Sequence, residues 1–208
     1  MHSSKGFTLI ELMVALLLAS LLMLTMLTLF KQISFIGMST AEDAEYEAQM
    51  EIGLLTISRL VTNAGYGMGQ DDDIVIGQYE GKRAVFWRYA QDHQVTPIVK
   101  ECRGFGVKIE GSGSEFKHRL LFLKAPCTQT DLIDETWSVV QPIATVKSEQ
   151  STSPAFGFSL IGGACVPFGI DQGSVKGNKR LVIEGTRKNN FGVGNKTRQI
   201  CFNNIKAP

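Results

Sequence analysis

The hydrophobic positions of this chain follow two different patterns. From Leu12 to Phe30 no residue is charged and nearly all are apolar, so the run exceeds the 18 residues that indicate a membrane-spanning helix. Further on, apolar residues recur every three or four positions, as on one face of an amphipathic helix: Met50, Leu54, Ile57, Val61 and Ala64. No proline interrupts either stretch. The pattern predicts one helix from Thr8 to about Asn63, which can bend at Gly37 or Gly53 and whose second half packs on a sheet.

After the helix the pattern changes to short runs of β-branched and aromatic residues, bounded by Gly, Pro, Asp, Asn or Ser, as strands are. The expected strands are 74–79, 84–89, 98–102, 106–110, 120–124, 137–145, 156–160, 181–184 and 199–202. Loops are expected at Gly111–Ser114, at 147–154 and at Gly162-Gly163. No second helical pattern follows Gly65, so we expect an α+β fold with one long N-terminal helix packed on antiparallel β-sheet.

A short, polar leader that carries Lys5 precedes the apolar run. A secretory signal has a shorter apolar region with a small-residue cleavage site behind it, and this sequence has neither. Positive charge before the span and acidic residues after it favour a cytoplasmic leader and an exported domain. A cut in front of the apolar run would leave the helix on the mature protein.

The residues around that point, Gly6-Phe7-Thr8-Leu9-Ile10-Glu11, resemble the class A leader of prepilins in the type IV pilin superfamily. In that family a membrane peptidase cuts after the glycine, here Gly6, and methylates the new amine, here that of Phe7. The phrase from Ser58 to Gly67, with its Ala-Gly-Tyr, resembles the end of the first helix in PilW-type minor pilins and J-type pseudopilins. We therefore divide the chain into a leader (1–6), a transmembrane half-helix (7–30), a periplasmic amphipathic half-helix (31–64) and a β-rich periplasmic domain (65–208).

Glu11 stands at the start of the apolar segment, where a charged side chain costs on the order of several kcal/mol and usually has a partner. The apolar residues on either side, from Leu9 to Met13, offer none. By resemblance, the family's glutamate at this place pairs with the amine of a neighbouring subunit during assembly, and burying two such groups together makes each tolerable. The alternative is that Glu11 stays wet at the lipid surface; the two roles are compatible in membrane and filament.

Four cysteines follow the membrane segment: Cys102, Cys127, Cys165 and Cys201. An even number in an exported domain indicates two disulfides and an oxidising compartment such as the periplasm, with four buried thiols as the alternative. Of the three possible connectivities we favour Cys102–Cys127 with Cys165–Cys201, because each would close neighbouring strands. The second pair also resembles the C-terminal disulfide loop of many pilins. No CxxC or CxxH spacing indicates zinc.

Charged residues mark three candidate surfaces. Segment 42–51 is acidic and has no Lys or Arg, which favours a solvated face over docking onto a basic neighbouring pilin. Residues 147–208 carry nine Lys or Arg against three Asp or Glu. Such a basic surface could contact acidic helices of adjacent subunits or bind DNA nonspecifically. The net charge of +1 for the whole chain argues against a bulk polyanion partner. Asp71-Asp72-Asp73 could hold calcium, but the EF-hand spacing is absent and a solvated loop is favoured.

No pattern of a known enzyme is present, since P-loop, HExxH and GxSxG motifs are missing. The glycines of 65–69 follow a helix instead of a strand, the reverse of a nucleotide-binding loop. His93 and His118 are interpreted as surface residues. We therefore expect no catalytic activity, no cofactor and no metal site.

Together these features predict a minor pilin of a type IV pilus, of PilW type, in the complex that initiates assembly and can remain at the tip. The resemblance implies the prepilin peptidase, other minor and major pilins and the inner membrane as partners. The alternatives are a J-type pseudopilin of a type II secretion system and a DNA-binding minor pilin of a competence pilus, with nucleic acid the less favoured partner.

Overall fold

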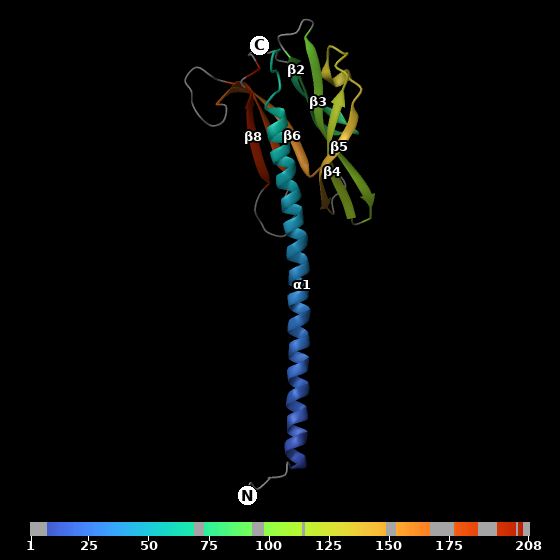
Figure 1. Ribbon diagram of the computed structural model, residues 1–208, viewed down its shortest axis with the longest axis vertical. Helices are drawn as coiled ribbons and strands as arrows, with labels where there is room; N and C mark the ends of the chain where they lie inside the picture. Colours follow the sequence, from blue (N-terminus) through green and yellow to red (C-terminus); the bar gives the residue numbers. More distant parts are fainter. Residues whose placement is uncertain are drawn as a thin grey trace. The chain divides into compact units, whose positions relative to one another are not determined.

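The computed structural model describes residues 8–68, 73–92, 98–113, 115–148, 153–166, 177–186, 195–202 and 204–205. In chain order the elements are α1 (Leu9–Val61), β1 (Ile74–Tyr79), β2 (Lys82–Asp92), β3 (Val99–Ser112), β4 (Glu115–Ala125), the short 3-10 helix η2 (Leu132–Asp134), β5 (Ser138–Ser148), β6 (Phe156–Cys165), β7 (Gly177–Gly185) and β8 (Lys196–Phe202) (Figure 1). The chain consists of two compact units, Met1–Glu45 and Tyr46–Pro208. The predicted α+β class is confirmed.

The first unit contains the N-terminal part of α1. Every large apolar side chain from Leu9 to Met38 is exposed, and by length and composition α1 is the one described helix that could cross a membrane. Its hydroxyl side chains donate to backbone carbonyls one turn earlier, as Ser20 does to Leu17 and Thr25 to Leu22, both at 2.8 Å. The few polar groups of the apolar stretch are thus satisfied within the helix, as a lipid environment requires.

The second unit contains two antiparallel sheets, ordered β1-β2-β3-β4-β5 and β6-β7-β8. Strands adjacent in sequence pair within each sheet, so both sheets are meanders. The two strands expected at 98–102 and 106–110 are one strand, β3. Gly162 and Gly163 were expected in a loop but lie in β6, where the register with β7 shifts.

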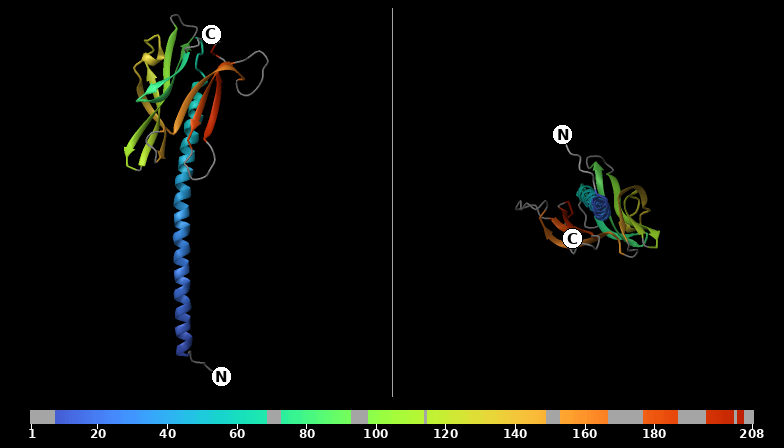
Figure 2. Two further views of the ribbon diagram at one scale, coloured as in Figure 1. Left: turned by 180° about the vertical axis from the view of Figure 1, so that it is seen from behind. Right: turned by 90° about the horizontal axis from the view of Figure 1, so that it is seen from below.

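From Tyr46 onward α1 packs against both sheets, which lie on either side of this end of the helix (Figure 2). The predicted apolar stripe is buried throughout, from Met50 to Ala64. It shares one hydrophobic core with Phe105 of the five-stranded sheet and Leu181 of the three-stranded sheet. Burial of the inner faces of both sheets therefore depends on the same helix face.

Gly53 is a point of close approach between this helix and both sheets. A Cβ atom at Gly53 would lie 2.6 Å from the Phe156 ring of β6 and 3.2 Å from Leu120 of β4. Both neighbours are fully buried and have little room to move. The glycine expected to be a weak point of the helix instead allows it to contact both sheets.

The outer face of the five-stranded sheet has a second core, covered by residues 126–137, which we call the strap. Phe86 of β2 lies flat at its centre, because Cβ atoms at Gly77 and Gly104 on the neighbouring strands would come within 2.7 and 2.6 Å of the ring. Trp137 at the end of the strap stacks on Phe86, with ring centroids 4.3 Å apart. The two glycines make the depression into which these aromatic rings fit.

The helix ends in the Ala-Gly-Tyr phrase noted in the sequence. Gly65 has a positive φ of 72°, and its N–H donates to the carbonyl of Arg88 in β2 at 2.9 Å. The N–H of Ala90 in turn donates to the carbonyl of Tyr66 at 2.8 Å. The phrase therefore fastens the end of the helix to β2, and glycine supplies the left-handed conformation that the turn needs.

Replacing Gly53 with alanine tests the close packing. Alanine normally stabilises a helix by about 1 kcal/mol relative to glycine, but overpacking a buried site costs about 1–3 kcal/mol. We expect G53A to lower the free energy of unfolding of the β-rich unit, measured by thermal melting of the full chain in detergent micelles. Gly37→Ala is the matched control, since nothing lies within 4 Å of its added methyl group, and the melting of the β-rich unit should be unchanged. A G53A variant as stable as the wild type would contradict the packing argument.

Candidate functional site

Glu11 and Thr8 form a closed pair of hydrogen bonds at the start of α1. The backbone N–H and the hydroxyl of Thr8 both donate to Glu11 Oε2 at 3.0 Å, and the N–H of Glu11 donates to Thr8 Oγ1 at 3.4 Å. This reciprocal arrangement of Thr and Glu three residues apart is a capping box, which satisfies helix N–H groups that otherwise lack a partner. The expectation that Glu11 has no partner nearby in its own chain was wrong, because Thr8 was overlooked.

The capping box uses only one of the two carboxylate oxygens. Oε1 of Glu11 makes no hydrogen bond with any residue that the structure describes. The carboxylate is thus held in a fixed position at the helix start while one oxygen can accept a further donor. Gly6 and Phe7, the expected cleavage and methylation residues, lie outside the described residues.

Two residues of the acidic segment are paired within the chain. Lys196 Nζ lies 2.5 Å from Glu47 Oε2 and 3.0 Å from Glu51 Oε1, and an Arg198 guanidinium nitrogen lies 2.9 Å from Glu51 Oε2. We call these four residues the ionic clasp. It corrects two expectations, because these acids are not simply solvated and two of the C-terminal cations are not free for another molecule.

The clasp shifts the pKa of two of its members. Hydrogen bonds from Lys196 and Arg198 lower the pKa of Glu51, and hydrogen bonds to Glu47 and Glu51 raise the pKa of Lys196. Next to it, the hydroxyl of Tyr46 donates to the carbonyl of Thr186 at 2.5 Å, and burial raises the Tyr46 pKa to about 12. At neutral pH all these groups are in the form that holds α1 against β7 and β8.

Both disulfides favoured by the sequence analysis are present, but only the first closes neighbouring strands as expected. Cys102 of β3 is bound to Cys127, which lies in the strap two residues after the end of β4, so this bond fastens the strap beside the paired strands β3 and β4. Cys165 at the end of β6 is bound to Cys201 of β8, past the start of the intervening β7. A Cβ atom on Gly177 would lie 2.4 Å from the sulfur of Cys201, so the crossing requires glycine there.

Two further polar side chains are buried, contrary to expectation. His118 of β4 is completely buried, and its Nδ1 accepts the N–H of Ala155 at 3.0 Å, which links the five-stranded sheet to the chain entering β6. Asp73 is also completely buried and pairs with Arg88 at 2.8 Å, while Arg88 donates to the Thr130 carbonyl of the strap. Asp73 therefore has a structural role instead of lying in a solvated loop.

No cluster of His, Cys, Asp and Glu suited to a metal ion occurs among the described residues. His93, Asp71 and Asp72 lie outside them, so the surface position expected for His93 and the calcium alternative are not addressed by the described residues.

Comparison with known proteins gives one match. Residues 1–27 match the family model described as the prokaryotic N-terminal methylation motif, which covers the leader and the first part of the apolar helix. No curated protein and no solved structure matches the chain. The motif is the leader type of type IV prepilins, and it covers the residues on which the sequence resemblance was based.

Replacing Glu51 with glutamine tests the ionic clasp. At neutral pH we expect E51Q to lower the free energy of unfolding by about 0.5–1 kcal/mol, as for a partly exposed ion pair, and to make stability less sensitive to salt. Because the folded-state pKa of Glu51 is depressed, its contribution is present above its usual value of 4.5 and is lost as the pH falls through the lower folded value. The difference between wild type and variant, measured by chemical denaturation, should therefore disappear in acid.

Glu115→Gln is the control, since the Glu115–Lys147 pair is more than 60% exposed on both sides. E115Q should leave stability unchanged at every pH. An E51Q effect that persists below the pKa of Glu51 would show that the loss does not come from the charge.

Proposed function

We propose that the chain, a member of the type IV pilin superfamily by its N-terminal methylation motif and its fold, is a minor pilin of PilW type. In this role it joins other minor pilins in the complex that initiates assembly of a type IV pilus and stays at the pilus tip. The motif implies processing by the prepilin peptidase and assembly with other pilins. The proposal adds that the domain is periplasmic before assembly and that the chain has no catalytic role.

The observation that carries the proposal is the arrangement at the start of α1. A long, exposed apolar helix begins with an acid whose position is fixed by Thr8 and which keeps one oxygen for a further donor. Cleavage after Gly6 would create a positive amine on Phe7, the residue next to Thr8. In a bundle of such helices the amine of one subunit can bind the free oxygen of Glu11 in the next, which removes the cost of burying either charge alone.

The described structure bears on only one of the two alternatives. A J-type pseudopilin of a type II secretion system would share the leader, the helix and the sheets, and no described feature favours it over a pilus subunit. For a DNA-binding pilin, the ionic clasp takes Lys196 and Arg198 away from the basic surface, because both are neutralised by acids of α1. We therefore retain the minor pilin as the proposed function.

One prediction of the proposed function concerns cleavage of the leader. Mass spectrometry of the pilus-associated protein should show Phe7 as an N-methylated first residue. A protein isolated with Met1 intact, or beginning beyond Phe30, would contradict the proposed processing.

Another prediction of the proposed function separates the charge of Glu11 from its capping role. Glu11→Ala removes both, whereas Glu11→Gln keeps a side-chain acceptor for Thr8, as glutamine does in other capping boxes, but loses the charge. We expect both variants to insert in the membrane normally and both to be strongly reduced in purified pili, because the amine of a neighbour needs a carboxylate. Glu115→Ala is the control. Glu115 is an exposed residue at the start of β4, so this variant should assemble normally. If E11Q assembles like the wild type while E11A does not, only the capping role matters.

A further inference from the structure

The two sheets differ in how their free edges are protected. Strands β1 and β6 contact each other, so β5 and β8 are the outer edges of the sheets that the described residues form. Strand β5 contains Pro142, which lacks a donor, and its register with β4 shifts twice, near Leu121 and near Leu123. Prolines and bulges are common means of preventing a further strand from pairing with an edge. Strand β8 has no proline, and its register with β7 is unbroken from Lys196 to Phe202.

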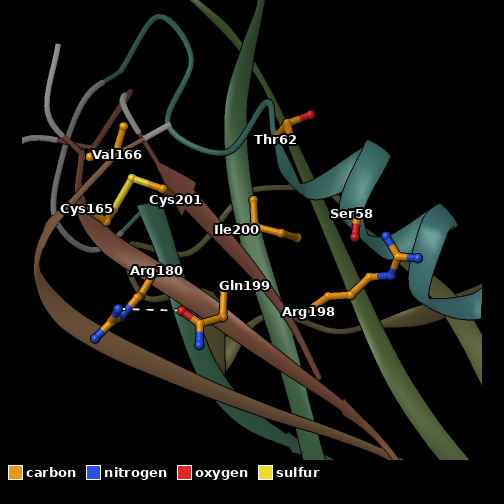
Figure 3. Close-up of a pocket in the computed structure, with 9 residues that line it drawn as sticks. All are labelled: Ser58, Thr62, Cys165, Val166, Arg180, Arg198, Gln199, Ile200 and Cys201. Carbon is orange, nitrogen blue, oxygen red and sulfur yellow. Dashed lines mark hydrogen bonds between the residues drawn. A yellow bond between two sulfur atoms is a disulfide. The ribbon is translucent and has the colours of Figure 1, made fainter. Parts of the chain in front are cut away.

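A hollow of about 490 Å³ lies along β8. Ser58 and Thr62 of α1 are on one side of it, and Gln199 and Cys201 of β8 are on the other (Figure 3). The hydroxyls of Ser58 and Thr62 already donate to carbonyls of their own helix. Among the described residues the backbone of β8 is paired only with β7, so its outward N–H and C=O groups are open to another strand.

Among the described residues that line this hollow, the two charged side chains are both positive. Arg198 belongs to the ionic clasp, whereas Arg180 of β7 is half-buried and has, within the described part of the chain, only a long hydrogen bond of 3.5 Å to Gln199. None of the described residues that line the hollow is acidic. A strand that adds to β8 would be favoured by carboxylates near Arg180. A second copy of β8 would bring no carboxylate to Arg180, because Lys196–Phe202 contains no Asp or Glu.

We propose that β8 accepts an extended, acidic segment of another protein as a fourth strand of the three-stranded sheet, with a carboxylate next to Arg180. The backbone of β8 provides the hydrogen bonds of strand addition, and the arginine selects for acidic side chains. This binding edge uses neither the leader nor Glu11, so it goes beyond the proposed function and stands or falls separately from it.

The test uses the full chain in detergent micelles and three synthetic seven-residue peptides. One alternates valine with glutamate, the second alternates valine with lysine, and the third is the glutamate peptide with a central proline. Binding is measured by fluorescence anisotropy, and hydrogen–deuterium exchange locates the bound peptide. We expect the glutamate peptide to bind, to weaken with added salt and to protect amides in Lys196–Phe202 but not in Ser138–Ser148. The lysine and proline peptides should bind at least about tenfold more weakly.

A charge reversal and its control complete the test. Arg180→Glu should weaken the glutamate peptide about tenfold and strengthen the lysine peptide, because attraction becomes repulsion at one half-buried site. Arg83→Glu, at an exposed arginine of the five-stranded sheet, should change neither affinity. Absence of binding at millimolar peptide, equal binding of acidic and basic peptides, protection outside β8, or a dimer of the chain formed through β8 would each overturn the proposal.

Discussion

The structure of the β-rich unit depends on the contact between one face of α1 and both sheets. The inner faces of the sheets are covered by the same stripe, from Met50 to Ala64, and the core it forms is continuous from Phe105 to Leu181. Gly53 sets the distance, because a side chain there would overlap Phe156 and Leu120. Because the core is closely packed, removing the helix would expose the apolar inner faces of both sheets to water. The part of α1 in the second unit, from Tyr46 to Val61, is therefore part of the domain core and not merely a connection to the apolar part of the helix.

Electrostatic and covalent contacts reinforce this packing at particular positions. The ionic clasp and the bond from Tyr46 to Thr186 hold the helix where it enters the domain, on the side of β7 and β8. The disulfide from Cys102 fastens the strap over Phe86, and the disulfide from Cys165 ties the two outer strands of the smaller sheet together. The clasp and the bond from Tyr46 resist relative movement of helix and sheets, while the disulfides stabilise the sheets themselves. Both effects suit a domain whose helix has to carry it from a membrane into an assembly.

The sequence predicted the features that are local or periodic. The stripe on α1 and most strands followed from spacing. The disulfide pairing was also predicted, but its reason, closure of neighbouring strands, holds for Cys102–Cys127 and not for Cys165–Cys201. The clasp could not be predicted, because Glu51 and Arg198 are far apart in sequence and only the fold brings them together. The buried positions of His118 and Asp73 depend on partners in other elements, Ala155 and Arg88, for the same reason. The capping box, in contrast, is a local pattern of Thr and Glu that the sequence contains and that was missed.

The capping box also resolves a physical difficulty in the assembly hypothesis. A carboxylate that waits for an amine has to remain in the membrane alone until assembly, and an unpartnered charge there is costly. Thr8 reduces this cost by donating twice to one oxygen, while the positive end of the helix dipole lies at the same position. Because the second oxygen remains open, a neighbour's amine can bind without breaking these bonds. The same side chain can therefore be tolerated before assembly and bind a neighbour during it, and no rearrangement of the helix start is needed between the two states.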